Sequence, residues 1–216
     1  MKTAIVVPAF NEAESISAMV AAICAYGTPI VVDDASTDDT GLRAAAAGAM
    51  VVRHETNRGY DGALASGFRK AEEIGAVCIV TIDADGQLDA GAIAPVLDKL
   101  EQRAQVVLGI RSAGAARFAE MLFNLYTRFR FGVPDILCGL KGFRTEAYAR
   151  HRDRAGKASV HTGLALALLQ EGAPFALVAV SVQPRRGASR YGSTWRGNVR
   201  ILRALVGALR DDLLTR

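Results

Sequence analysis

Two acidic side chains interrupt an apolar segment near the middle of the chain. Asp83 and Asp85 follow residues 77–82, whose length and apolar composition are typical of a buried strand. Side chains two residues apart on a strand point to the same side, so the two carboxylates would lie together at its end. They would repel one another unless a cation lay between them, and a hard divalent ion is the simplest choice. The alternative is a solvated acidic turn that ends the strand.

Further polar clusters come directly after apolar segments of the same kind. Asp34 follows one such segment, and the cluster from Pro8 to Glu12 follows another. Asn11 and Glu14 have the spacing of a capping pair for the first helix. We expect strands at residues 3–7, 29–32, 50–53, 77–82 and 105–109, and helices at residues 12–26, 38–47, 63–74 and 90–103.

This alternation of apolar strands and helices predicts an α/β fold with a mostly parallel central sheet and helices on both faces. Ligands of such sheets bind beyond the carboxyl ends of the strands, where the strand order reverses. The polar clusters all fall at these ends. We therefore expect Asp34 and the pair Asp83 and Asp85 to contribute to one site.

The second half of the chain is more basic and more amphipathic. Residues 110–116 are an expected loop that contains Arg111, and residues 117–131 are an expected helix. The apolar stripe of that helix consists of Phe118, Met121, Leu122, Leu125, Tyr126 and Phe129. It is either a face packed on the core or the apolar face of a helix that contacts lipid. We also expect helices at residues 146–151, 161–171 and 195–214, a strand at residues 175–182 and a basic loop at residues 184–193.

The composition is that of one globular domain. Of the 216 residues, 50% are hydrophobic and 22% are charged, which suffices for a single core. The net charge of +4 suits anionic small molecules or an anionic membrane surface as well as nucleic acid. The three cysteines are widely spaced and indicate neither a disulfide framework nor a zinc site. The chain shows no signal peptide pattern and no apolar run near the ~20 residues of a spanning helix, so we expect a cytoplasmic protein.

Four motifs in chain order resemble the nucleotide-sugar half of glycosyltransferase family 2, which has the GT-A fold. They are P-A-F-N-E at residues 8–12, V-D-D-A-S at 32–36, N-R-G-Y at 57–60 and D-A-D-G-Q at 83–87. The later pattern D-x-x-C-G-x-K-x-F at residues 135–143 and the basic loop at 186–191 resemble the polyprenyl and dolichyl phosphate sugar transferase branch. The resemblance implies one GT-A domain over residues 1–216, with a nucleotide-sugar half at 1–110, an acceptor half at 111–193 and an amphipathic C-terminal helix at 194–216.

On the donor side, the resemblance implies a role for each motif. The residues that would bind the nucleotide sugar are Pro8, Phe10, Glu12, Asp34, Asp83, Ala84, Arg186 and Arg190. Asp34 would accept a hydrogen bond from the base, and the two arginines would clamp the diphosphate. Asp83, Asp85 and Gln87 would hold Mg²⁺ or Mn²⁺ against that diphosphate, and Asp85 is counted among the catalytic residues.

The acceptor half of the chain lacks an obvious general base. A hydroxyl acceptor must lose a proton, whereas a phosphate acceptor need not. Hydroxyl-specific relatives often place an acid at the helix start that corresponds to residues 161–163, and this chain has none there. Arg111, Arg117 and Lys141 instead resemble the positions that bind a lipid phosphate, and Arg111 is also expected to be a catalytic residue. Asp135 is the catalytic base if the acceptor is a hydroxyl.

We therefore expect an inverting transferase that moves mannose or glucose from GDP-mannose or a UDP-hexose to polyprenyl or dolichyl phosphate. No nucleic acid partner is expected. Because no spanning helix is seen, the chain would reach the cytoplasmic face of the membrane peripherally or through a membrane-anchoring partner. His161 is expected to begin a helix, and His54 and His151 are expected at the surface. Asp61 stands where relatives often have a small residue.

Three alternatives remain open at this stage. The first is a soluble family 2 enzyme with a hydroxyl acceptor, which would depend on Asp135. The second is a sugar nucleotidyltransferase, which is disfavoured because no glycine-rich, basic phosphate loop follows the first strand. The third is a non-enzymatic basic module that binds nucleic acid or membrane. It explains the arginines but not the clustered acids.

Overall fold

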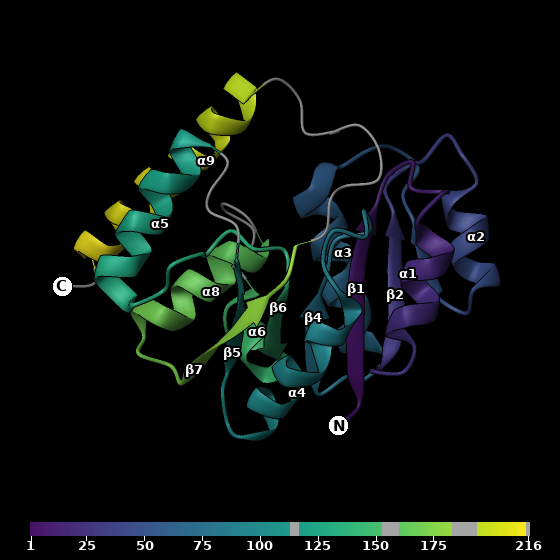
Figure 1. Cartoon of the computed structure of the whole chain (residues 1–216), viewed down its shortest axis with the longest axis horizontal. Helices are drawn as coiled ribbons and strands as arrows, with labels where there is room; N and C mark the ends of the chain where they lie inside the picture. The colour runs from purple at the N-terminus through teal and green to yellow at the C-terminus, as the bar shows by residue number, and fades with distance from the viewer. Residues whose placement is uncertain (113–116, 153–159, 183–193, 215–216) are drawn as a thin grey trace.

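The computed structural model describes residues 1–112, 117–152, 160–182 and 194–214 (Figure 1). Its strands are β1 (Thr3–Ala9), β2 (Thr28–Asp33), β3 (Met50–Arg53), β4 (Cys78–Thr81), β5 (Val106–Arg111), β6 (Lys141–Arg144) and β7 (Phe175–Val180). Its helices are α1 (Ile16–Ile23), α2 (Thr40–Ala46), α3 (Gly59–Glu73), the 3₁₀ turn η1 (Ala90–Ala92), α4 (Ile93–Glu101), α5 (Phe118–Phe131), α6 (Thr145–Arg150), α8 (Val160–Gln170) and α9 (Thr194–Leu214).

The strands form one sheet in the order β3-β2-β1-β4-β6-β5-β7. All neighbouring pairs are parallel except those of β6, which runs antiparallel to both β4 and β5. The expected fold class, a mostly parallel sheet between helices, is confirmed. The chain order reverses between β1 and β4, because β2 and β3 lie to one side of β1 and β4 lies to the other. This is the edge at which ligands of such sheets bind.

Strand β6 was not predicted, because residues 132–145 carry no apolar run long enough to indicate a strand. Its four residues hold only one large apolar side chain, Phe143, which is buried in the core. Gly142 allows the strand to lie directly against α4, since a Cβ atom there would come within 2.4 Å of Val96 Cγ1. A strand of this kind is recognised by what packs on it, and sequence periodicity does not show that.

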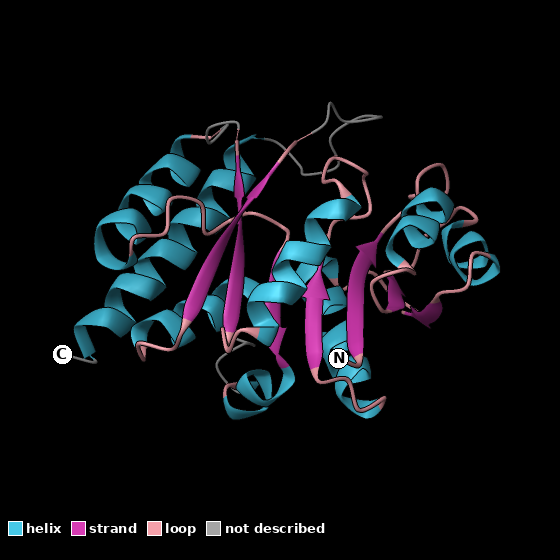
Figure 2. Cartoon of the chain, turned by 60° about the horizontal axis from the view of Figure 1, so that its bottom comes forward, coloured by secondary structure: helices cyan, strands magenta, loops and turns pink. Residues whose placement is uncertain are grey.

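The sheet separates two hydrophobic cores, and helices cover both of its faces (Figure 2). One core lies under α3, α5, α6, α8 and α9 and contains Phe68, Phe123 and Leu164. The other lies under α1, η1 and α4 and contains Ile16 and Ile93. The buried strands therefore have apolar side chains on both sides, which is why they appear in the sequence as unbroken apolar runs.

The first helix begins later than expected, at Ile16 rather than at residue 12. The predicted capping pair of Asn11 and Glu14 is wrong. Asn11 has a positive φ of 54°, and its side-chain oxygen accepts hydrogen bonds from the backbone N–H of Thr37 at 2.8 Å and from its hydroxyl at 3.2 Å. The side chain that would have capped the helix thus joins two loops instead.

Helices α5 and α9 lie side by side, away from α1 and α2 (Figure 1). Arg130 Nε on α5 donates to both carboxylate oxygens of Asp212 on α9, each at 3.0 Å. The predicted apolar stripe of α5 divides between two environments: Leu122 and Tyr126 pack on the core, whereas four residues are exposed. The exposed residues are Phe118, Met121, Leu125 and Phe129. Interpreting the whole stripe as a core face is therefore wrong.

No helix in the described part of the chain is both long enough and apolar enough to cross a membrane.

Candidate active site

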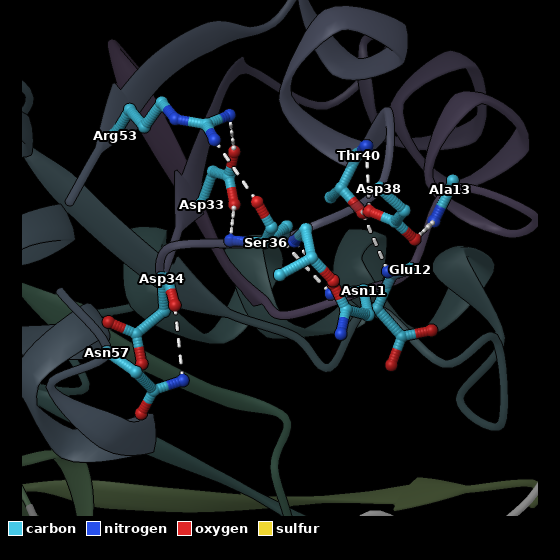
Figure 3. Close-up of polar contacts among 11 residues, drawn as sticks. Asn11, Glu12, Ala13, Asp33, Asp34, Ser36, Asp38, Thr40, Arg53 and Asn57 are labelled. Carbon is cyan, nitrogen blue, oxygen red and sulfur yellow. Dashed lines mark hydrogen bonds and ion pairs between the residues drawn. The ribbon is translucent and has the colours of Figure 1, made fainter. Parts of the chain in front are cut away.

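The loops after β1 and β2 are joined by side-chain hydrogen bonds to backbone N–H groups (Figure 3). Ser36 Oγ accepts from Asn11 N at 2.9 Å, and Thr40 Oγ1 accepts from Glu12 N at 2.7 Å. Asp38 Oδ2 accepts from Ala13 N at 3.2 Å. The polar residues of the second loop thus hold the backbone of the first in place, which fixes the position of the P-A-F-N-E motif.

Asp33 and Asp34 are adjacent in sequence, but their side chains have different hydrogen-bond partners. Asp33 is fully buried, and its oxygens accept from Ser36 N at 2.9 Å and from Arg53 Nη1 at 2.8 Å. Asp34 Oδ1 lies 2.6 Å from His54 Nδ1 and accepts from Arg58 N at 2.8 Å. Asp33 therefore acts as a structural carboxylate that holds the loop and β3.

The prediction that His54 and His151 lie at the surface is wrong, because both side chains are buried. His54 follows β3 at the same edge of the sheet as Asp34 follows β2, and it is held against Asp34 there. His151 lies with its Nε2 atom 3.0 Å from Glu171 Oε2. His161 stands at the start of α8, as expected, and is also buried.

Asp83 is the first residue of the D-A-D-G-Q turn that follows β4. Two other segments enclose its carboxylate. The hydroxyl of Tyr60 donates to Asp83 Oδ1 at 2.8 Å. Gly139 lies so close that a Cβ atom there would come within 2.1 Å of Asp83 Oδ2. Burial raises the pKa of Asp83, the nearby charge of Asp85 raises it further, and the hydrogen bond from Tyr60 acts against both.

The turn after Asp83 presents a second, partly buried carboxylate, Asp85, whose Oδ1 accepts from Gln87 N at 3.1 Å. The described residues contain no group of three or more His, Cys, Asp or Glu side chains arranged to hold a metal. Two carboxylates nevertheless fit Mg²⁺ or Mn²⁺, which proteins often bind through one or two carboxylates with substrate phosphates supplying further ligands. Burial and the charge of Asp85 both raise the pKa of Asp83, so a cation beside the pair would favour the charged form of these carboxylates.

The segment from Asn57 to Tyr60, which leads into α3, connects the two acidic motifs. Asn57 Nδ2 donates to the backbone oxygen of Asp34 at 3.1 Å, and Arg58 N donates to its side chain. Two residues further on, Tyr60 reaches Asp83. The expectation that Asp34 and the D-A-D turn belong to one edge of the sheet agrees with this arrangement, since one short segment bonds to both.

Arg111, at the end of β5, forms a two-pronged ion pair with Asp135. Arg111 Nε lies 2.7 Å from Asp135 Oδ2 and Nη2 lies 2.9 Å from Oδ1, and the backbone N–H of Arg111 donates to Oδ2 as well. These bonds raise the pKa of Arg111. Burial alone would raise the pKa of Asp135, but the hydrogen bonds and charge of Arg111 outweigh it and hold that pKa below its usual range.

Lys141 is completely buried on β6, and its ammonium donates to the backbone oxygen of Cys138. Burial lowers the pKa of Lys141 to about 8, although the nearby charges of Asp135 and Asp83 oppose the change. Burial also lowers the pKa of His161, and the charge of Lys141 acts in the same direction. Direct contact between Lys141 and an acceptor phosphate, as predicted, does not fit this burial. In this structure the charge of Lys141 instead lowers the pKa of His161 and opposes the rise in the pKa of Asp83.

The remaining predicted residues are distributed as follows. Pro8 and Ala84 are buried, and Phe10 is exposed next to Glu12, whose carboxylate accepts from Ser15 Oγ at 3.1 Å. Arg117 precedes α5, with its Nε atom 4.0 Å from Glu120 Oε1. Arg186 and Arg190 lie outside the described residues.

The contacts of Tyr60 and Gly139 with Asp83 were not predicted, and His54 was expected at the surface. Tyr60 and Gly139 were within quoted motifs, N-R-G-Y and D-x-x-C-G-x-K-x-F, but a motif does not say which side chains meet. A signal for His54 was available, since it directly follows an expected strand at the edge where Asp34 was expected.

The fold and these motifs define a family. Residues 4–151 match Glycosyl transferase family 2, and the chain belongs to this family. This confirms the predicted resemblance.

Among curated proteins, an uncharacterised glycosyltransferase of Mycobacterium tuberculosis is 39% identical over 141 residues, which is 61% of this chain and 63% of the relative. The polyprenol monophosphomannose synthase of Mycolicibacterium smegmatis is 29% identical over 165 residues, which is 67% of this chain and 62% of that protein. The chain thus spans a little less than two thirds of the length of these relatives.

Among solved structures, glucosyl-3-phosphoglycerate synthase from Mycobacterium tuberculosis, in complex with Mn²⁺, UDP and glucosyl-3-phosphoglycerate, superposes with a TM-score of 0.74. The match covers 95% of this chain and 80% of that one, at 23% identity. At this identity the likeness supports the fold, and the expected GT-A architecture is confirmed.

Proposed function

We propose that the chain is an inverting, metal-dependent glycosyltransferase that moves a hexose from a nucleotide sugar to polyprenyl or dolichyl phosphate. The donor would be GDP-mannose or a UDP-hexose. The observation that carries the acceptor assignment is the ion pair of Arg111 and Asp135, because it removes the carboxylate that a hydroxyl acceptor would need as a base.

The donor half of the proposal rests on the edge where β1, β2 and β4 end. Asp34 would accept a hydrogen bond from the nucleotide's base. Pro8, Phe10 and Glu12 would surround that base and the ribose. Asp83, Asp85 and Gln87 would hold the divalent ion, which would supply positive charge to stabilise the leaving nucleoside diphosphate. The enclosure of Asp83 by Tyr60 and Gly139 supports this role, since it fixes one carboxylate of the pair before a donor binds.

The acceptor half rests on charge and protonation. A carboxylate whose pKa is held low by two bonds from Arg111 is a weak base near neutral pH. Glu120, the other acid beside Arg111, lies 3.6 Å from its Nη2 atom. A phosphate oxygen is already a nucleophile, so it can attack the anomeric carbon in line while the bond to the diphosphate oxygen breaks. Arg111 and Arg117 would orient this phosphate.

The proposal also includes contact of helices α5 and α9 with the membrane surface. Helix α5 starts directly after Arg117 and exposes Phe118, Met121, Leu125 and Phe129 along one stripe, and Phe129 is 83% exposed. On the neighbouring α9, Leu202, Val206 and Leu209 are exposed too. Exposed arginines at positions 128, 130, 203 and 210 flank these side chains. Apolar side chains bordered by cations suit an anionic bilayer surface, to which a lipid acceptor is confined.

The names of two relatives support a lipid acceptor. One is the polyprenol monophosphomannose synthase of Mycolicibacterium smegmatis. The other is the UDP-N-acetylglucosamine–dolichyl-phosphate N-acetylglucosaminyltransferase of Methanococcus voltae, which is 31% identical over 174 residues. A second candidate is transfer to a small phosphorylated acid. The likeness to glucosyl-3-phosphoglycerate synthase, crystallised with phosphoglyceric acid, makes it worth testing.

The deciding experiment measures transfer from GDP-mannose, UDP-glucose and UDP-N-acetylglucosamine to undecaprenyl phosphate, dolichyl phosphate or 3-phosphoglycerate, with MnCl₂, MgCl₂ or EDTA. We expect transfer to a lipid phosphate that stops in EDTA. Transfer to 3-phosphoglycerate alone would instead support the second candidate. Transfer unaffected by EDTA would contradict the metal role, and failure to bind any nucleotide sugar would contradict the whole proposal.

The rival hydroxyl-acceptor mechanism makes a separate prediction for Asp135. If Asp135 were the base, Asp135→Asn would abolish turnover even at saturating acceptor. If Asp135 only orients Arg111, the same change would mainly raise the KM for the phosphate acceptor. The two mechanisms are therefore separated by measuring kcat and KM for this one variant.

A further inference from the structure

Three buried polar side chains form a continuous row that begins at Asp34, the residue proposed to bind the nucleotide base. His54 Nδ1 lies 2.6 Å from Asp34 Oδ1, and His54 Nε2 lies 2.9 Å from Ser66 Oγ. The exposed fractions are 3% for Asp34, 5% for His54 and 7% for Ser66. The row joins the loop after β2, the loop after β3 and the middle of α3.

This arrangement has the order of an Asp-His-Ser triad, but Ser66 cannot act as a nucleophile. It is buried inside α3, and Arg69 Nη2 donates to its Oγ at 3.1 Å. A nucleophilic serine must reach a substrate carbonyl. The end of the row at Asp34 follows β2 at the carboxyl edge of the sheet, beside the proposed donor site.

The partners of His54 determine the direction of its hydrogen bonds. A carboxylate only accepts, so the nitrogen that faces Asp34 donates. In the neutral imidazole with Nδ1 protonated, Nε2 accepts from the O–H of Ser66, whose Oγ also accepts from Arg69. The two contacts hold the imidazole in one orientation, with its Nδ1–H directed at Asp34. The backbone N–H of His54 adds a bond to Asp33 O at 2.9 Å.

We propose that His54 is a positioning residue that aims Asp34 at the base of the nucleotide, an inference that rests on the proposed function. The donors His54 Nδ1 and Arg58 N both bind Oδ1, so they fix the plane of the carboxylate. Neither bond uses Oδ2, which is the oxygen left to accept from a ligand.

A fixed acceptor oxygen selects a particular class of nucleotide. Uracil and guanine carry a protonated ring nitrogen on their pairing edge and can donate to Asp34. Cytosine and adenine carry an unprotonated ring nitrogen there, whose lone pair would face the carboxylate. A site that hydrogen-bonds one partner rejects an analogue that leaves its buried polar group unpaired. His54 would therefore contribute to the selection of uridine or guanosine diphosphates over cytidine diphosphate.

The test measures binding of UDP, GDP and CDP to the full chain in MnCl₂ by calorimetry. His54→Ala removes the donor to Asp34, whereas His54→Asn places an amide N–H near the position of Nδ1 and is the matched control. We expect wild-type protein to prefer UDP or GDP over CDP, and His54→Ala to lose about tenfold of that preference, the size expected for a hydrogen bond to a charged group. His54→Asn should restore most of it. Turnover at saturating donor should change by less than about threefold, because a positioning residue for the base does not stabilise the reacting centre.

The outcomes separate this inference from the proposed function. If wild-type protein binds none of the three nucleotides, the proposed function fails. If it binds them with equal affinity, or if folded His54→Ala keeps the full preference, the positioning role is overturned while the proposed function stands. If thermal unfolding shows that His54→Ala is not folded, Ser66→Ala decides in its place. Loss of the Ser66 hydroxyl, which bonds His54 Nε2, should reduce the preference for UDP or GDP over CDP by about threefold, in line with one neutral hydrogen bond. An unchanged preference would overturn the inference.

Discussion

Arg111 and Asp135 are joined by two side-chain hydrogen bonds, of 2.7 and 2.9 Å, and by a third bond from the backbone of Arg111. The pair ties the end of β5 to the segment that leads into β6. It also holds down the pKa of Asp135, the carboxylate predicted as the base for a hydroxyl acceptor.

The pH dependence of stability should reflect this pair. The pKa of Asp135 is lower in the folded protein than in the unfolded chain, where it is about 3.9. Its stabilising contribution is therefore complete above that value and is lost as the pH falls through the lower, folded pKa. Asp135→Asn should reduce the free energy of unfolding by about 2 kcal/mol at pH 7. The difference from wild type should stay constant from pH 8 to about pH 5 and shrink below about pH 4.

Urea unfolding at a series of pH values measures this difference. The exposed Asp98 on α4 supplies the control, since Asp98→Asn removes a carboxylate without breaking a described ion pair. A difference for Asp135→Asn that changes between pH 6 and pH 8 would show that the pair is not held as described.

Metal-dependent nucleotide binding should depend on Asp85 and not on the acid that follows it. Asp85→Ala removes one of two carboxylates that would hold the ion, and we expect Mn²⁺-dependent UDP or GDP binding to weaken by about a hundredfold, a typical loss for a metal-site change. Asp89→Ala is the matched control, because the exposed Asp89 only caps the turn η1, accepting from Gly91 N. Equal losses in both variants, measured by calorimetry with and without EDTA, would argue against a metal at Asp85.

Gly139 should tolerate no side chain. In Gly139→Ala the new Cβ would lie 2.1 Å from Asp83 Oδ2 and 2.6 Å from its Cγ, so the loop or the carboxylate must move. We expect a loss of about 1 to 3 kcal/mol in the free energy of unfolding, as for other overpacked sites, together with loss of Mn²⁺-dependent nucleotide binding.

Gly207→Ala on α9 is the control for this substitution, since a Cβ there meets nothing within 4 Å. Alanine should stabilise that helix by up to about 1 kcal/mol and leave nucleotide binding unchanged. If Gly139→Ala behaved like Gly207→Ala, the close contact with Asp83 would not exist in solution.

The exposed stripe of α5 should carry membrane binding. Leu125→Ser with Phe129→Ser should reduce sedimentation with vesicles of phosphatidylglycerol and phosphatidylcholine by at least about tenfold, because two large apolar side chains, each worth about 1.5 to 3 kcal/mol when buried, no longer enter the bilayer. Nucleotide binding should not change. Leu42→Ser on α2 is the control, since Leu42 is 72% exposed on a helix remote from α5 (Figure 1). Undiminished vesicle binding by the double variant would assign the stripe to another role.

The α/β architecture, and the edge at which the acidic motifs lie, could be predicted from the sequence. Unbroken apolar strands must be buried on both faces, and parallel strands bring their carboxyl ends to one edge. From this it followed that Asp34 and the pair Asp83 and Asp85 lie at one edge, and the segment from Arg58 to Tyr60 does bond to both Asp34 and Asp83. The family followed from the order of the same motifs.

The pairing of the charged groups depends on contacts that form only when the chain is folded. Asp135 lies 24 positions from Arg111 and His54 lies 20 from Asp34, so neither contact leaves a periodic trace in the sequence. The burial of Lys141 was equally hidden, because a lysine on a short strand is expected at the surface. Whether a carboxylate is a base, a partner for a cation or an acceptor for a nucleotide base depends on its neighbours in space. Those neighbours come from segments that only the packing of the sheet and its helices brings together.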